Sequence, residues 1–152
     1  MAPTPRQAGA AGTDGAGELT AHSLSEWDAH ALEAAVGLGE AHDDVTVVTA
    51  TVGPPAADSV VRVALARGAD RAIRIWDDRL AEPDLLDPRL RARLLAAVAD
   101  ELAPTLVLTG ARSGPEGSGA TGVALAATLE YGWATVVTDV SLDRDAGVVS
   151  VR

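Results

Sequence analysis

One run of β-branched and apolar side chains, residues 45–52, constrains the fold of this chain most strongly. The run ends directly at Gly53 and Pro54, which are typical of a turn. Its apolar residues fall on both faces of a strand, whereas a strand with one solvated face alternates apolar and polar residues. We therefore expect residues 45–52 to form a buried strand of a parallel sheet that is covered on both sides.

Helical and extended patterns alternate along the rest of the chain, which predicts a layered α/β domain with right-handed crossovers. Residues 1–23 are rich in Ala, Gly, Pro and Thr and have no apolar period, so we expect a disordered leader before a single domain over residues 24–152. Helices are expected over residues 26–40, from Pro55 to Gly68, and over 88–103 and 120–130, and further strands over 72–76, 106–108, 134–142 and 148–151.

Charge and composition exclude several classes of function. The formal net charge is -10 and every basic residue is an arginine, which disfavours nucleic acid as a partner. Cysteine is absent, which excludes disulfides, thiol nucleophiles and thiolate metal sites, and the histidines do not fall in a metal-ligand spacing. No apolar run approaches the roughly eighteen residues of a membrane span, and the N-terminus lacks a signal-peptide layout. We expect a cytoplasmic protein with no metal and no membrane span.

The most suggestive segment for ligand binding is the loop at residues 110–121, between an expected strand and an expected helix. Its glycines allow backbone N–H groups to approach an anion, and the positive end of the following helix faces the loop. Composition is equally typical of a flexible connection, and neither the Walker A lysine nor the dinucleotide spacing is present. The candidate contacts are Gly110, Ala111, Arg112, Ser113, Gly114, Gly117, Ser118, Gly119, Ala120 and Thr121.

Other segments offer less specific signals. Trp27, at the start of the first expected helix, is suited either to stacking on a base or to packing on the core. Glu82, Asp84 and Asp87 resemble a paired-carboxylate site, but an acidic loop in an acidic protein is typical of a solvated surface. No Ser/His/Asp arrangement or activated nucleophile is apparent, so we predict no catalytic residues.

The order of these segments resembles the β-subunit of electron transfer flavoprotein. Residues 25–28 (Ser-Glu-Trp-Asp) are similar to that family's Asn-Pro-Phe-(Cys/Asp) helix start, and residues 53–54 to its Gly-Pro turn. The most specific match is residues 64–72 (Ala-Leu-Ala-Arg-Gly-Ala-Asp-Arg-Ala). Residues 106–110 lead into the family's loop, and Trp-Ala-Thr at 133–135 stands in the place of its Trp-Pro-Gln-Ala-Thr.

This resemblance, which covers about residues 24–151, implies a three-layer α/β/α, Rossmann-like fold of the adenine-nucleotide-hydrolase type with a mostly parallel sheet. The family begins with a central strand that residues 1–23 do not resemble, so we expect that strand to be missing in a truncated or divergent member. The implied AMP contacts outside the loop are Ser25, Glu26, Trp27, Asp28, Val52 and Gly53.

The resemblance also implies a role and partners. A β-subunit of this family holds AMP, while an α-subunit supplies most contacts to FAD, and the pair accepts electrons from flavin dehydrogenases. The chain is then an electron-carrier subunit and not an enzyme. Two alternatives remain open at this point. One is a homodimeric ATP-binding module similar to the universal stress proteins, and the other is a structural member of the family that binds no nucleotide.

Overall fold

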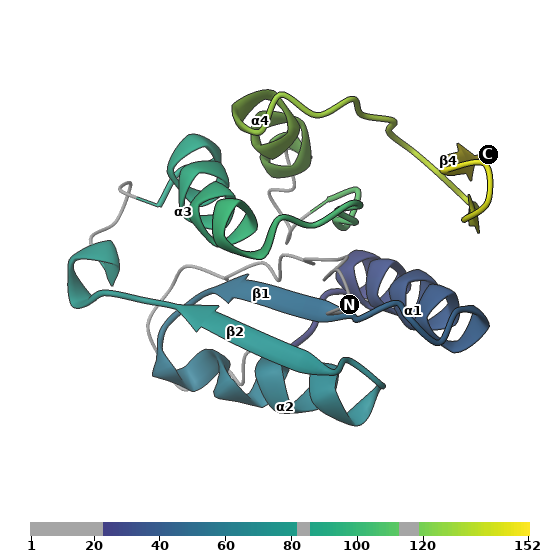
Figure 1. Ribbon diagram of the computed structural model, residues 1–152. Coiled ribbons are helices and arrows are strands. Elements are labelled where there is room, and N and C mark those ends of the chain that lie inside the picture. Colours follow the sequence, from purple (N-terminus) through teal and green to yellow (C-terminus); the bar gives the residue numbers. More distant parts are fainter. Residues whose placement is uncertain (1–22, 82–85, 113–118) are drawn as a thin grey trace.

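Residues 23–81, 86–112 and 119–152 are described by a computed structural model of the protein. Within them, helices lie on both sides of a two-stranded parallel sheet (Figure 1). The elements around this sheet are α1 (Glu26–Ala41), β1 (Val48–Val52), the short 3-10 turn η1 (Pro55–Ala57), α2 (Asp58–Ala66), β2 (Arg71–Ile75), the 3-10 turn η2 (Asp78–Ala81), α3 (Pro88–Leu102) and α4 (Ala120–Thr128).

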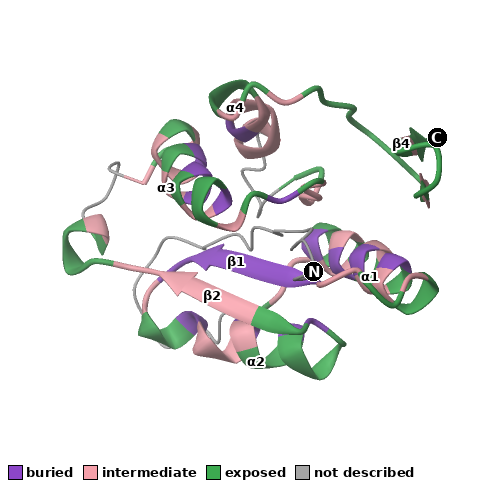
Figure 2. Cartoon of the chain, viewed as in Figure 1, coloured by how far each residue is buried: buried purple, intermediate pink, exposed green. Residues whose placement is uncertain are grey.

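Strand β1 is buried on both faces, as its sequence predicts (Figure 2). On one face, Val52 belongs to an apolar cluster with Leu95 of α3 and Leu125 of α4. On the other face, Val47, just before the strand, packs with Leu32 of α1. β1 pairs with β2 in parallel, which confirms the expected parallel arrangement and the α/β class.

The turn between α2 and β2 explains the specific sequence Gly-Ala-Asp-Arg. Gly68 has a φ of 107°, a conformation that side chains disfavour, and a Cβ there would lie 2.9 Å from Cγ1 of Val36. Asp70 then accepts a hydrogen bond on Oδ2 from the Val47 N–H at 2.7 Å, at the entrance to β1. This segment therefore fixes the relative position of α1, β1 and β2, which is a structural role.

The four expected helices are confirmed, and two of them, α1 and α3, begin at a local side-chain cap. Ser25 caps α1 by accepting from the Asp28 N–H at 3.1 Å. Asp87 caps α3 by accepting from the Leu90 N–H at 2.7 Å, and Pro88 follows in the first helical position.

The expected strand at residues 106–108 is wrong as a paired strand. Among the described residues, no strand pairs with this segment. Val107 nevertheless packs on the cluster at α3 and α4, and Leu108 packs on the cluster at α1 and α2. The side chains thus alternate across the sheet layer as the pattern predicts, but a ladder also needs a hydrogen-bonded neighbour, which the pattern of one segment does not provide.

The expected strand at residues 134–142 is correct only at its end. β3 (Val140–Asp143) pairs antiparallel with β4 (Val148–Val151), and the expected final strand is confirmed. The side chains of residues 134–139 are exposed, and Val136 is 83% exposed. A tight turn joins the two strands, and in it the Asp143 carboxylate accepts from the Ala146 N–H at 2.9 Å. The hairpin extends away from α4 (Figure 1).

The described helices include none that is both long and apolar enough to cross a membrane. The leader expected at residues 1–23 falls almost entirely outside the described residues.

Candidate functional site

Three glycines bring the two ends of the 110–121 loop close to their neighbours. A Cβ at Gly110 would lie 2.6 Å from Oδ1 of Asp28, one at Gly119 would lie 2.7 Å from the Ala111 carbonyl oxygen, and one at Gly122 would lie 2.5 Å from Oγ1 of Thr109. Each distance is shorter than a side chain tolerates, so none of the three positions has room for a side chain in this arrangement. We call Thr109, Gly110, Ala111, Gly119 and Gly122 the loop neck.

The first side of the loop neck lies against the start of α1. The Gly110 N–H donates to Oδ1 of Asp28 at 3.1 Å, and a Cβ on Gly110 would meet the backbone N of Asp28 and the backbone C of Trp27 at 2.9 and 3.0 Å. The first turn of α1 therefore lies directly beside the first residue of the loop. Two predicted contact regions, residues 25–28 and the first residue of the loop, are brought together.

The second side of the loop neck is the start of α4. Gly119 has a φ of 60° and stands in the N-cap position, where it makes no side-chain cap hydrogen bond. The first N–H groups of a helix have no partner within the helix, and together with the helix dipole they favour an anion. The loop thus joins a glycine-rich entry to the positive end of α4, which suits a phosphate group.

The contact between α4 and Thr109 was not anticipated from the sequence. Gly122 lies inside α4, and the Thr109 hydroxyl occupies the space next to its Cα. The available signal was a glycine within a helix otherwise rich in alanine, which often marks a close packing contact.

Replacing Gly122 with alanine tests this contact. We expect a net destabilisation of about 1–3 kcal/mol from the overlap with Thr109, although alanine normally favours a helix. A second substitution, Thr109→Ala, removes the overlapping oxygen and should restore most of that loss. Denaturant unfolding of the wild type, both single variants and the double variant measures the coupling. A Gly122→Ala variant as stable as the wild type would contradict the contact.

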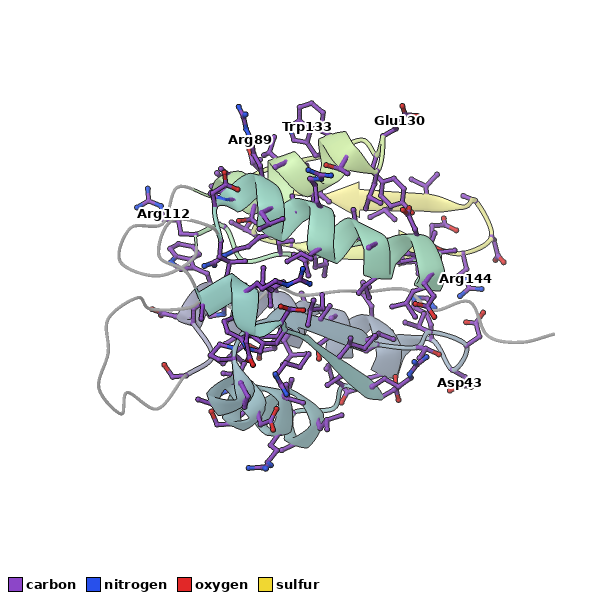
Figure 3. All side chains as sticks on the ribbon, turned by 90° about the vertical axis from the view of Figure 1, so that its left-hand side faces the viewer. Asp43, Arg89, Arg112, Glu130, Trp133 and Arg144 are labelled. Carbon is purple, nitrogen blue, oxygen red and sulfur yellow. The ribbon has the colours of Figure 1, made fainter. Side chains whose placement is uncertain are left out.

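Trp27 and Arg112 point outward. Trp27 is 49% exposed, so it is not enclosed in the core and about half of its surface is accessible at the start of α1. Arg112 is exposed, and Figure 3 shows its side chain projecting away from the body of the protein. Glu26, also exposed, adds a negative charge to the first turn of α1. A positive and a negative side chain are therefore both exposed near the loop neck.

Several residues predicted to contact a ligand are instead buried or hydrogen-bonded within the protein, and others lie outside the described residues. Val52 is 3% exposed within the core, and the Gly53 N–H donates to the Ile75 carbonyl at 3.1 Å. These two residues are thus engaged in packing and pairing, and their contact with a ligand stays a prediction. Ala120 and Thr121 form the first turn of α4. Ser113, Gly114, Gly117 and Ser118 lie outside the described residues.

The acidic candidates form no site in the described part of the chain. Asp87 is the cap of α3, and Glu82 and Asp84 lie outside the described residues. Nearby, the Arg79 guanidinium hydrogen-bonds to the Asp77 carboxylate and lowers the pKa of Asp77 to about 2. Both side chains of this pair are solvated, so we assign it no function. No group of three metal-binding side chains occurs among the residues described.

Comparison with known sequences shows which family this chain resembles. A model of the electron transfer flavoprotein domain matches residues 17–152. The chain is 39% identical over 119 residues to the electron transfer flavoprotein subunit beta of Methylophilus methylotrophus. It belongs to the electron transfer flavoprotein β-subunit family. The suspected resemblance is thereby confirmed.

The alignments with these relatives cover most of this chain but only about half of each relative. The Methylophilus alignment covers 78% of this chain and 44% of the relative. The β-subunit of Bradyrhizobium diazoefficiens is 32% identical over 86% of this chain and 51% of its own length. The human β-subunit is 33% identical over 82% of this chain and 48% of its own length. The chain therefore spans about half the length of these β-subunits.

Proposed function

We propose that this chain is an electron-carrier subunit, not an enzyme, that binds AMP at the loop neck and pairs with an FAD-carrying α-subunit. The observation that carries the proposal is the close approach of Gly110 to the first turn of α1, with the start of α4 at the other end of the same loop. Two helix N-termini beside one glycine-rich loop suit an adenine nucleotide phosphate.

Within this proposal the other contacts have distinct roles. The positive end of α4 attracts the phosphate, and the exposed ring of Trp27 offers a surface on which adenine stacks. Arg112 supplies an exposed positive charge beside the loop neck. The fold is the three-layer, Rossmann-like arrangement of the adenine-nucleotide hydrolases, in which a ligand lies at the carboxyl ends of parallel strands.

The partners in this proposal follow from the family. The α-subunit holds most of the FAD, the pair accepts electrons from flavin dehydrogenases, and the setting is the cytoplasm. The relatives are named electron transfer flavoprotein subunit beta, and this name supports a subunit of a larger electron carrier.

Calorimetry with AMP, ADP, ATP and FAD tests the nucleotide proposal. We expect one AMP per chain, tighter than ATP, together with a change in tryptophan fluorescence that Trp27→Phe removes. The matched control is Trp133→Phe, because Trp133 is also exposed, at 63%, but lies beyond α4 (Figure 3). A folded chain that binds none of the four ligands would contradict the proposal and favour a purely structural member of the family.

Size measurement tests the pairing. Light scattering after chromatography of the chain, alone and co-expressed with an α-subunit, should show a heterodimer that contains FAD. A homodimer that forms with ATP and does not bind the α-subunit would favour the alternative, a module similar to the universal stress proteins.

A further inference from the structure

The Asp28 carboxylate is buried at the junction between α1 and the loop neck. Its residue is 5% exposed, although it lies in the first turn of a surface helix. Oδ2 accepts a hydrogen bond from the Ser25 hydroxyl at 2.7 Å, and Oδ1 accepts one from the Gly110 N–H at 3.1 Å. Asp28 and Gly110 are 82 positions apart in the sequence, so this carboxylate joins distant parts of the chain.

This arrangement gives each carboxylate oxygen of Asp28 a hydrogen bond within the protein. The Ser25 hydroxyl donates to one oxygen and also accepts from the Asp28 N–H, which fixes the side chain over its own helix turn. The other oxygen holds the first N–H of the loop. A carboxylate in the first turn is favoured by the helix dipole, so the pair of contacts stabilises the junction without a ligand.

We propose, on the basis of the proposed AMP site, that Asp28 is a positioning residue for the Gly110 loop and makes no direct contact with the nucleotide. Its acceptor oxygen orders Gly110 against α1 before the nucleotide arrives. Its negative charge opposes the negative charge of a phosphate bound nearby, because Asp28 lies directly beside the loop neck at Gly110. The hydrogen-bond acceptor and the charge therefore have opposite effects on affinity.

Two substitutions separate these effects. Asp28→Asn removes the charge but keeps a carbonyl oxygen that accepts from the Gly110 N–H. Asp28→Ala removes both. Glu26→Gln is the matched charge control, since it removes one carboxylate from the same helix turn. The Glu26 side chain is exposed, and among the described residues it makes no hydrogen bond to the loop neck.

The experiment measures AMP affinity by calorimetry and hydrogen exchange of the Gly110 amide by nuclear magnetic resonance in the chain without nucleotide. We expect Asp28→Ala to speed exchange at Gly110 and to weaken AMP binding, each by about tenfold or more, as loss of a hydrogen bond to a charged group implies. Asp28→Asn should keep the slow exchange and should bind AMP as tightly as the wild type or more tightly, in parallel with Glu26→Gln.

Two outcomes would overturn the proposal. If Asp28→Asn loses as much affinity as Asp28→Ala while Gly110 exchange stays slow, the carboxylate contacts the ligand directly. If Gly110 exchange is unchanged in Asp28→Ala, the carboxylate does not order the loop. Should Asp28→Ala fail to fold, Ser25→Ala, which removes the hydroxyl that donates to Oδ2 but leaves the Gly110 hydrogen bond, and Asp28→Asn still supply both readouts. The absence of AMP binding in the wild type would refute the proposed function alone, since the exchange measurement needs no nucleotide.

Discussion

Replacing Gly110 with alanine is expected to abolish measurable AMP binding and to lower the stability of the fold. The new Cβ would lie 2.6 Å from Oδ1 of Asp28, 2.9 Å from its backbone N and 3.0 Å from the backbone C of Trp27. Two of these atoms belong to the backbone of α1, so a rotamer change cannot relieve the overlap. Forcing the loop away from α1 should cost about 1–3 kcal/mol or more, which is the usual effect of overpacking.

The matched control for this variant is Gly132→Ala, because nothing lies within 4 Å of the Cβ position at Gly132. That control should bind AMP like the wild type and unfold at the same denaturant concentration or a slightly higher one. Calorimetry with AMP and urea unfolding are the two measurements. A Gly110→Ala variant that retains wild-type affinity would show that the loop and α1 do not need their close approach to bind nucleotide.

Gly110 and Gly122 differ in the kind of atom that a new Cβ would meet, so substitutions at each glycine test a different side of the loop neck. At Gly122 the obstructing atom is a side-chain oxygen of Thr109, so a second substitution can remove it. At Gly110 the obstruction includes backbone, so no single second substitution restores the space. We therefore expect strong coupling between positions 109 and 122, and no comparable rescue of Gly110→Ala by Asp28→Ala.

The parts of the fold that could be predicted are those whose signals are local. Ser25 and Asp87 cap helices through hydrogen bonds within the next three residues, and both helices begin as expected. The burial of β1 on both faces follows from its composition. Pairing is different, because a strand needs a neighbour that its own sequence does not specify, and the segment at 106–108 lies in the sheet layer without one among the described residues.

The site shows the same division. The glycine-rich loop and the start of α1 were recognisable from residue types and from the family's order of segments. The sequence did not show that the Asp28 side chain turns inward to Gly110, or that the Thr109 hydroxyl fills the space beside Gly122. Both contacts join residues from separate elements, and they depend on how α1 and α4 pack, which spacing along the chain does not determine.

Truncating Leu95 to alanine should give the largest loss of stability in the core, about 2–5 kcal/mol. Leu95 is 2% exposed, and its cluster joins Val52 of β1 to Leu125 of α4 across one face of the sheet. Removing its side chain leaves a cavity beneath both elements. Since domains of this kind are typically stable by only about 5–15 kcal/mol, the loss should be a large fraction of the total.

Leu65→Ala provides the matched comparison, because Leu65 undergoes the same chemical change in a helix but is 44% exposed. We expect it to cost less than about 1 kcal/mol, as for surface positions, with an unchanged dependence on denaturant. Similar losses in the two variants would mean that α3 does not pack on β1 as described. Because Leu125 anchors α4, a loss at Leu95 should also loosen the helix behind the loop, so AMP affinity should fall in Leu95→Ala even where the protein remains folded.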